Sequence, residues 1–279
     1  MKKIVAALAA GAALLATAGT AAAQDWSRIR IATEGAYPPW NTTNAAGQLE
    51  GFEIDLAKDL CRRMEAECEI VAQEWDGIIP GLTTGRYDAI MAGMSVTDER
   101  RQVISFAGPY ATEPIVFSAL KDSPLLKLDF PVDRVDYNQV SAEEQQALDT
   151  LAKALEGQTV GVQVATTHQN MMQEYLPDVD VQTYDKVDSI ALDLLSGRID
   201  AMLADSSATR SVIETQGGVE IFGPGFTGGP IGIGVGVGVR QGDDALREKF
   251  DAAIKAATED GTIARMTTQW FGFDASMKE

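Results

Sequence analysis

The chain has little histidine and little cysteine, and these scarcities exclude several kinds of site. Among 279 residues there is one histidine and there are two cysteines. A zinc site usually takes four closely spaced ligands, but His168 lies far along the chain from Cys61 and Cys68. The two cysteines also lack the Cys-x-x-Cys spacing of a redox pair. We therefore expect neither a metal site nor a cofactor.

The cysteines favour one structural disulfide instead. Proteins exported to an oxidising compartment commonly pair an even number of closely spaced cysteines. Because a bond between Cys61 and Cys68 would close only a short loop, we expect it to stabilise the fold modestly, by about 2 kcal/mol.

Positive charge is also scarce. Lys and Arg together number 23 against 41 Asp and Glu, which gives a formal net charge of −18. Nucleic acids and anionic membranes attract basic surfaces. The charge balance therefore argues against both as partners, although it does not name the partner.

Long apolar runs are confined to the N-terminus. Two lysines precede an apolar stretch at 4–18, and Ala21-Ala22-Ala23 follows as a small-residue cleavage pattern. These are the parts of a signal peptide, whereas a membrane-spanning helix needs roughly 20 apolar residues. We predict that residues 1–23 direct export to the periplasm and are cleaved near Ala23.

Strand and helix patterns alternate along the rest of the chain. Residues 28–32 alternate as in a strand, residues 52–64 carry apolar side chains near a period of 3.6 as in a helix, and residues 69–72 form a second strand pattern. This order predicts an α/β protein with a mostly parallel sheet.

An internal repeat predicts two lobes of similar build. Residues 76–92 (DGIIPGLTTGRYDAIMA) and 188–204 (DSIALDLLSGRIDAMLA) share a helix that ends at a glycine and continues into a short strand. The glycines, Gly85 and Gly197, can adopt the left-handed cap conformation at little cost. Two copies of one unit indicate a duplicated architecture.

The residues that follow these two strands are candidate binding residues. Ligands of open α/β sheets bind outside the carboxyl ends of the strands. Gly93, Met94 and Ser95 follow the first strand, and Asp205-Ser206-Ser207 follows the second. We expect both segments to face a cleft that the two lobes share.

Two glycine- and proline-rich stretches, at 108–114 and 223–230, separate the lobes. Two crossings between lobes mean that the first lobe is discontinuous. We place lobe 1 at residues 24–112 and 226–279, and lobe 2 at residues 113–225.

Several motifs, in this order, are similar to those of a known family. They are 33–40 (TEGAYPPW), 51–56 (GFEIDL), 60–64 (LCRRM) with Cys68, 75–82 (WDGIIPGL), 94–101 (MSVTDERR) and 259–262 (EDGT). The chain resembles the periplasmic polar amino-acid-binding proteins of ABC importers (bacterial solute-binding protein family 3). The likeness is to the branch that binds lysine, arginine, ornithine, histidine and opines.

The resemblance implies a fold and a mode of action. The fold is the two-lobed α/β periplasmic-binding-protein (Venus-flytrap) fold, which closes about a hinge when ligand binds. The ligand would be a small amino acid or opine, the protein would act as a monomer, and its partner would be the membrane permease of an ABC importer.

The resemblance also implies how the ligand backbone is held. Arg100 would take the α-carboxylate, which suits the two-pronged geometry of a guanidinium. Ser95 and the backbone of Thr167 would donate further hydrogen bonds to it. Asp205 would pair with the α-ammonium, assisted by the carbonyl of Gly93.

The ligand side chain would lie between two aromatic rings. Tyr37 and Trp75 resemble the family's sandwiching aromatics, which suit an alkyl stem or a planar cation. Glu34 resembles the acid at the far end, which selects a basic or guanidino tail.

The chain departs from the lysine- and arginine-binding pattern at two places. Ala92-Gly93 stands where serines are common, which removes hydroxyls and widens the floor of the site. His168 stands where glutamine is common, and its place beside Thr167 makes it a candidate contact. These departures leave room for a bulkier arginine derivative such as an opine.

We therefore predict a periplasmic protein that binds a cationic L-amino acid or an arginine-derived opine and has no catalytic residues. One alternative is an exported, dehydratase-like enzyme on the same fold, which would need a positioned general acid or base. A second alternative is a receptor that presents its ligand to a chemosensory system.

Overall fold

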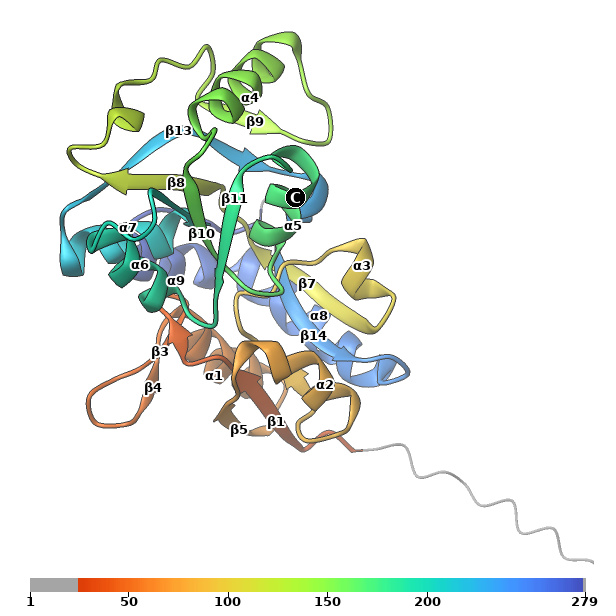
Figure 1. Cartoon of the computed structure of the whole chain (residues 1–279). Helices are drawn as coiled ribbons and strands as arrows, with labels where there is room; N and C mark the ends of the chain where they lie inside the picture. The colour runs from red at the N-terminus through yellow and green to blue at the C-terminus, as the bar shows by residue number, and fades with distance from the viewer. Residues whose placement is uncertain (1–24, 278–279) are drawn as a thin grey trace, which may run out of the picture.

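The computed structural model describes residues 25–277. They form two lobes, each built on its own sheet, one above the other in Figure 1. The predicted signal peptide lies outside the described residues. No helix within 25–277 is both long enough and apolar enough to cross a membrane.

Lobe 1, the lower lobe in Figure 1, contains a five-stranded sheet with helices packed around it. The sheet strands are β1 (Arg28–Thr33), β5 (Glu67–Ala72), β6 (Ala89–Ile90), β7 (Ile104–Ala111) and β14 (Val235–Arg240). Strands β2 (Ala36–Tyr37), β3 (Asn41–Thr43) and β4 (Leu49–Glu50) form a small separate sheet. The helices are α1 (Phe52–Arg63), η1 (Trp75–Gly77), α2 (Ile78–Thr83), α3 (Asp98–Arg101), α8 (Asp244–Glu259) and α9 (Thr262–Phe271).

Lobe 2 contains a six-stranded sheet. Its strands are β8 (Ile115–Leu120), β9 (Arg134–Asp136), β10 (Thr159–Gln163), β11 (Asp180–Tyr184), β12 (Ala201–Asp205) and β13 (Val219–Thr227). The helices of this part of the chain are η2 (Pro124–Lys127), α4 (Ala142–Ala154), α5 (Thr167–Tyr175), α6 (Val187–Leu195) and α7 (Ser206–Gln216), and η3 (Gly229–Ile231) follows β13.

The two sheets share one topology. The strand orders are β5-β1-β6-β14-β7 and β11-β10-β12-β8-β13-β9, so β1 and β10 hold equivalent places, each second from one edge, and β9 extends the second sheet at the other edge. Only β14 in the first sheet and β8 in the second run against their neighbours. The prediction of an α/β fold with mostly parallel strands is therefore confirmed.

The internal repeat corresponds to one unit of this shared topology. In lobe 1 the unit is α2 followed by β6, and in lobe 2 it is α6 followed by β12. Gly85 and Gly197 follow the two helices with φ angles of 77° and 71°. Glycine adopts this left-handed conformation without the strain that a side chain would cause. The predicted caps are confirmed.

The chain crosses between the lobes twice. The first crossing joins β7 of lobe 1 to β8 of lobe 2. Strand β13 stays in the second sheet as far as Thr227, and β14 lies in the first sheet from Val235. The second crossing therefore lies between these two residues, after the predicted boundary at 225/226, because Phe226 and Thr227 still pair with strands of the second sheet. Lobe 1 is discontinuous.

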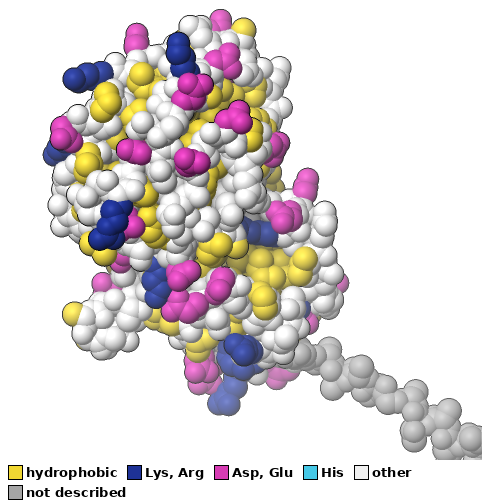
Figure 2. Space-filling view, in the orientation of Figure 1, with side chains coloured by type: hydrophobic (Ala, Val, Ile, Leu, Met, Phe, Trp, Pro, Cys, Tyr) yellow, Lys and Arg dark blue, Asp and Glu magenta, His cyan; other side chains and the backbone are white. Residues whose placement is uncertain are grey.

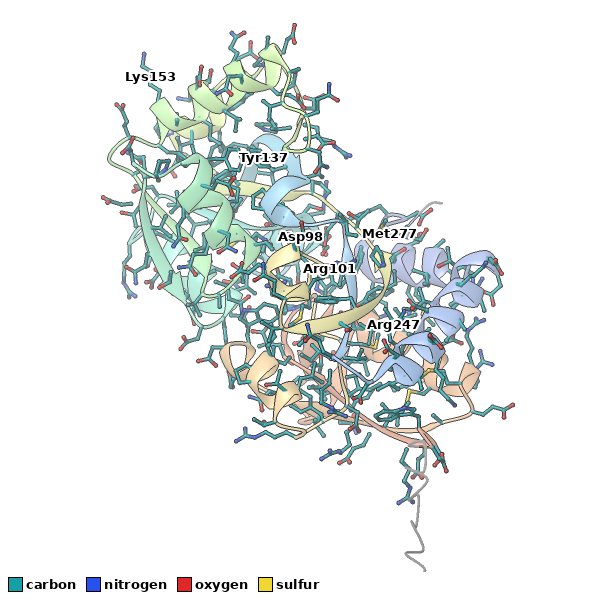
Figure 3. All side chains as sticks on the ribbon, turned by 90° about the vertical axis from the view of Figure 1, so that its right-hand side faces the viewer. Asp98, Arg101, Tyr137, Lys153, Arg247 and Met277 are labelled. Atoms are coloured by element: carbon teal, nitrogen blue, oxygen red, sulfur yellow. A yellow bond between two sulfur atoms is a disulfide. The ribbon has the colours of Figure 1, made fainter. Side chains whose placement is uncertain are left out.

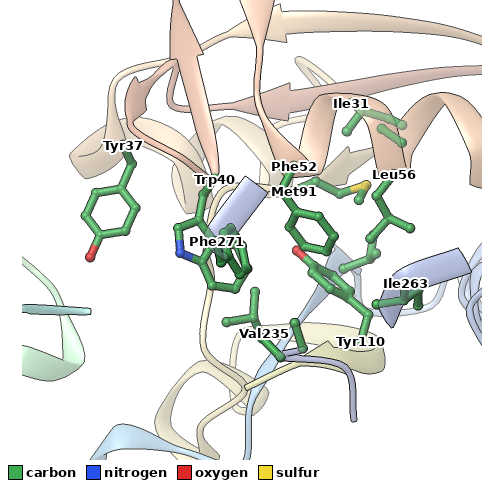
Figure 4. Packing of buried hydrophobic residues seen from close by; sticks show 14 of the residues in the cluster. Ile31, Tyr37, Trp40, Phe52, Leu56, Met91, Tyr110, Val235, Ile263 and Phe271 are labelled. Atoms are coloured by element: carbon green, nitrogen blue, oxygen red, sulfur yellow. The ribbon is translucent and has the colours of Figure 1, made fainter. Parts of the chain in front are cut away.

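Aromatic packing fixes the part of lobe 1 that faces lobe 2. Trp40 is fully buried, and its ring lies 4.8 Å from that of Phe271 and 5.6 Å from that of Phe52, measured between centroids. Figure 4 shows these three rings packed together beside Tyr110. Burying large side chains of this kind contributes about 1.5–3 kcal/mol each to stability. The cluster therefore holds the Trp40 side chain in a fixed position.

The predicted disulfide between Cys61 and Cys68 is confirmed. It joins helix α1 to strand β5 within lobe 1. The bond therefore stabilises one lobe and leaves the relative position of the two lobes unconstrained.

Candidate functional site

A cavity lies between the two lobes, where β1, β6, β10 and β12 end. It has an empty volume of about 310 Å³, part of which is open to solvent. Its lining residues are Glu34, Tyr37, Trp75, Ala92, Gly93, Ser95, Arg100, Gln163, Thr166, Thr167, His168 and Asp205. The first seven belong to lobe 1 and the last five to lobe 2. In the space-filling view the molecule narrows where the two lobes meet (Figure 2).

All of the predicted ligand contacts except Met94 line this cavity. Met94 has no exposed surface and packs in a hydrophobic cluster of lobe 1. Its carbonyl accepts a hydrogen bond from the amide of Gly236 at 3.1 Å. Met94 thus ties the segment to lobe 1, while Gly93 and Ser95 on either side of it face the cavity.

Two lining residues, Gln163 and Thr166, are absent from the prediction. Gln163 is the last residue of β10, and Thr166 caps the N-terminus of α5 by accepting a hydrogen bond from the amide of Gln169. The rule that ligands bind at the carboxyl ends of strands applies to β10 as well. Applied to that strand, it would have named both residues.

Hydrogen bonds cross the cavity from one lobe to the other. Gln163 Nε2 donates to Glu34 Oε1 at 2.6 Å, and Trp75 Nε1 donates to the carbonyl of Ala165 at 3.3 Å. Tyr37 Oη donates to Asp205 Oδ2 at 2.7 Å. The lobes are therefore in contact around the cavity, which is a closed arrangement.

Arg100 presents a positive charge to the cavity. Its Nη1 donates to the carbonyl of Ser95 at 2.9 Å, and its guanidinium lies 5.3 Å from the centre of the Trp75 ring. Burial lowers the pKa of Arg100 to about 10, so the side chain stays cationic at neutral pH. No ion pair to Arg100 occurs among residues 25–277. An anion entering the cavity would supply that missing partner.

The start of helix α5 adds a second attraction for an anion. Thr166 and Thr167 form the N-terminus of this helix and both line the cavity. The first amide groups of a helix have no partner within it, and the helix dipole places partial positive charge there. The side of the cavity with Arg100, Ser95 and Thr167 is therefore suited to a carboxylate.

Asp205 presents a negative charge to the same cavity from lobe 2. It is the last residue of β12 and immediately precedes α7. Its Oδ2 accepts the hydrogen bond from Tyr37, and its Oδ1 lies 3.6 Å from Nε2 of His168. That nitrogen is buried and has no hydrogen-bond partner in the described part of the chain. The Asp205 carboxylate is therefore suited to a cation that binds beside the Tyr37 hydroxyl and His168, or in place of one of these contacts.

Glu34 lies at another side of the cavity and is almost fully buried, with 6% of its surface exposed. Burial raises the pKa of Glu34 to about 7, against the opposing effect of the Gln163 hydrogen bond. A cationic group beside Glu34 would favour the ionised carboxylate and lower its pKa again. The site is therefore suited to a positively charged tail.

A buried carboxylate supports the floor of the cavity. Glu53 Oε1 accepts a hydrogen bond from the amide of Gly93 at 2.7 Å and another from the hydroxyl of Tyr110. Its Oε2 accepts one from Asn41 Nδ2 at 2.7 Å. A methyl group added at Gly93 would be in ordinary van der Waals contact with the Tyr37 ring, at 3.7 Å.

Comparison with known proteins agrees with this architecture. Residues 29–273 match the family described as bacterial extracellular solute-binding proteins, family 3. The chain belongs to this family. The predicted resemblance is therefore confirmed.

Relatives within the family are named for amino acids or an opine. The chain is 41% identical over 286 residues to the octopine-binding periplasmic protein of Rhizobium meliloti, covering 95% of this chain and 97% of that protein. It is 34% identical to ABC transporter arginine-binding protein 1 of Escherichia coli, covering 97% and 99%. A solved periplasmic protein of the His/Glu/Gln/Arg/opine-binding family from Silicibacter pomeroyi, in complex with lysine, matches with a TM-score of 0.72. That structure is 34% identical and covers 90% of this chain, while all of its own chain is covered.

Proposed function

We propose that the protein binds a cationic L-amino acid, such as arginine, ornithine, lysine or histidine, or an arginine-derived opine, in the periplasm. It then presents the ligand to the membrane permease of an ABC importer. One observation carries the proposal: Arg100 from lobe 1 and Asp205 from lobe 2 place opposite charges on a single cavity. An α-amino acid has a carboxylate and an ammonium on one carbon, so it can satisfy both residues at once.

The rest of the cavity supports a long, positively charged side chain. Tyr37 and Trp75 offer aromatic faces, and Glu34 offers a carboxylate. Aromatic faces attract guanidinium and ammonium groups, and a buried carboxylate gains a partner from the same group. The names of the octopine- and arginine-binding relatives and the lysine complex support this class of ligand.

A second hollow supports the opine as a candidate. It has an empty volume of about 330 Å³ and shares Ser95 and Asp205 with the main cavity. It continues past Thr112, Glu113 and Thr227 toward the crossings between the lobes. An arginine-derived opine carries a carboxyalkyl group on the α-nitrogen, the atom that we assign to Asp205. That group would point from Asp205 into the second hollow.

We infer that the protein leaves its ligand chemically unchanged. The three acidic and arginine side chains of the cavity, Glu34, Arg100 and Asp205, each have a binding role in the proposal. Product formation during prolonged incubation with arginine or octopine would contradict the inference that the ligand is left unchanged.

The family membership and the signal-like segment at 1–23 support export, cleavage near Ala23 and action as a monomeric binding protein.

A thermal-shift panel tests the proposed ligand class directly. A ligand that binds only the folded state raises the melting temperature, and the rise grows with the logarithm of the ligand concentration relative to Kd. We expect arginine, ornithine, lysine, histidine or octopine to raise it, and we expect glutamate and leucine not to. A shift with only neutral or acidic amino acids would show that the ligand assignment is wrong. Calorimetry would then rank the compounds that bind.

The affinity for a cationic ligand should fall as the pH falls. The raised pKa of Glu34, about 7, means that this carboxyl takes up a proton below pH 7 in the ligand-free protein. Binding a cation requires the ionised form, so the affinity is fully present above pH 7. It should drop by up to about tenfold per pH unit below that, until the lower pKa of the complex is reached.

Calorimetry with arginine at about pH 8, 7 and 6 would measure this slope. Glu34→Gln is the matched control, because it keeps the shape and removes the titrating group. This variant should bind arginine more weakly than wild type at pH 8 and should show a shallower pH dependence. If it keeps the same slope, another group is responsible and Glu34 does not hold the cationic tail.

A further inference from the structure

A buried glutamate outside the predicted site links the two lobes. Glu113 lies on the first crossing, between β7 and β8, and is 8% exposed. Its Oε1 accepts hydrogen bonds from Trp40 Nε1 at 3.0 Å and from Ser207 Oγ at 2.5 Å. Its Oε2 accepts from Ser206 Oγ at 2.5 Å and from the amide of Ser207 at 2.7 Å. Both oxygens of the carboxylate are thus fully used.

Three of these four donors belong to the first turn of α7. An aspartate directly before a helix usually caps it, by accepting a hydrogen bond from an amide of the first turn. Asp205 occupies that position but makes no such bond. Glu113 accepts the hydrogen bond from the Ser207 amide in its place. The negative charge of Glu113 also suits the positive end of the helix dipole.

The Asp205 carboxylate is therefore free to face the binding cavity, where it meets Tyr37 and His168. We propose that Glu113 is a positioning residue that caps α7 in place of Asp205 and so keeps the Asp205 carboxylate directed at the ligand ammonium. This inference rests on the proposed function, since it assumes that Asp205 pairs with the ligand. Glu113 does not line the main cavity, but it does line the second hollow, so its positioning role is tested with a ligand that fills the main cavity alone.

Lobe 1 holds the other side of the Glu113 carboxylate. Trp40 donates its indole N–H to Glu113 and also lies within 3.0 Å of Ser207 Oγ. The Trp40 ring is held in the aromatic cluster with Phe52 and Phe271, with its nitrogen at the edge of that cluster (Figure 4). The position of Glu113, and through it the start of α7, is thus set by the rigid core of lobe 1.

A double-mutant cycle tests the inference. Wild type, Glu113→Gln, Asp205→Asn and the double variant are titrated by calorimetry with L-arginine, which has no carboxyalkyl group to enter the hollow that Glu113 lines. Burial and the neighbouring Asp205 charge raise the pKa of Glu113 to about 7, so the titrations are made at about pH 8, where more of this carboxylate is ionised. Glutamine has the same shape as glutamate, but its NH₂ group faces hydrogen-bond donors and cannot accept hydrogen bonds from them.

We expect Glu113→Gln to weaken binding by about tenfold, in line with the loss of a helix cap. If Glu113 acts through Asp205, the double variant should bind no more weakly than Asp205→Asn alone, because residues that act through one another are not additive. Losses that multiply would overturn the inference, as would an unchanged affinity of Glu113→Gln. An unchanged affinity of Asp205→Asn would instead overturn the proposed function on which the inference rests.

Two further variants separate positioning from simple loss of stability. Ser141→Ala removes the side-chain cap of α4. Neither Ser141 nor any residue of this helix lines the cavity. It should lower the melting temperature and leave the affinity unchanged. Ser206→Ala removes one donor to Glu113 and keeps the hydrogen bond that the Ser206 backbone amide donates to the Pro114 carbonyl. It should weaken binding by about threefold, and only while Asp205 is present. Ser206→Ala therefore tests the inference even if Glu113→Gln does not fold.

A crystal structure of Glu113→Gln provides the direct readout. The inference expects the Asp205 carboxylate to turn toward α7 and accept a hydrogen bond from an amide of its first turn. An Asp205 side chain that remains bonded to Tyr37, in a variant with weakened binding, would overturn the proposed mechanism.

Discussion

Asp205→Ala is expected to weaken the affinity for L-arginine by at least thirtyfold. Removing one partner of a buried, hydrogen-bonded charge pair typically costs about 2–5 kcal/mol, which corresponds to roughly thirtyfold to several thousandfold in affinity. Asp205 qualifies because its side chain is only 17% exposed and lies on the cavity opposite Arg100. The ligand ammonium would lose its counter-charge and much of its hydration together. Calorimetry at about pH 8, above the pKa of Glu34, measures the loss.

The control for this prediction is Asp178→Ala. Asp178 is an exposed acid of lobe 2 outside the cavity, so this variant changes the net charge by the same amount. Its affinity should equal that of wild type. A folded Asp205→Ala variant that binds as well as Asp178→Ala would refute the role of Asp205.

Much of the fold could be predicted because local rules and the tertiary structure agree. The glycines after α2 and α6 mark the ends of two equivalent helices, and the repeat around them locates β6 and β12. The rule for strand ends then points to Ser95 and Asp205 without reference to any relative. Both residues line the cavity.

The prediction failed where contacts join distant parts of the chain without a local pattern. Glu113 binds Trp40, 73 positions away, and Ser207, 94 positions away. A single glutamate before a proline has no periodicity that would show it to be buried. Its role becomes visible only when the crossing, the aromatic cluster and the start of α7 are brought together.

Met94 and Gln163 illustrate the limit of the strand-end rule. The rule locates a segment but does not say which of its side chains face the cavity. Met94 turns into the core of lobe 1, whereas Gln163 turns toward Glu34. An apolar side chain is more stable when buried in the core and an amide when hydrogen-bonded. Side-chain polarity would therefore have refined the choice.

Arg100 offers the second large effect, and its neighbour Arg101 offers a matched control. The two residues are adjacent in α3, but Arg100 lines the cavity while Arg101 is exposed and lines a separate groove. Figure 3 shows Asp98 and Arg101 of this helix at the junction of the two lobes. Arg101→Ala removes the same charge from the same helix. It should leave the affinity for arginine unchanged.

Arg100→Ala should weaken the binding of L-arginine by at least thirtyfold, because a carboxylate would then be desolvated without its buried partner, at a cost of about 2–5 kcal/mol. Arg100→Lys should recover part of the loss, since lysine keeps the charge but lacks the planar fork that binds a carboxylate through two hydrogen bonds. Agmatine, which is arginine without the carboxylate, separates this role from a general loss of structure. Wild type should bind agmatine much more weakly than arginine, because agmatine leaves the buried Arg100 guanidinium without a carboxylate partner. In Arg100→Ala that guanidinium is absent, so the difference in affinity between arginine and agmatine should be smaller. Calorimetry in which Arg100→Ala loses the same factor for both compounds would mean that Arg100 supports the cavity but does not contact the ligand carboxylate.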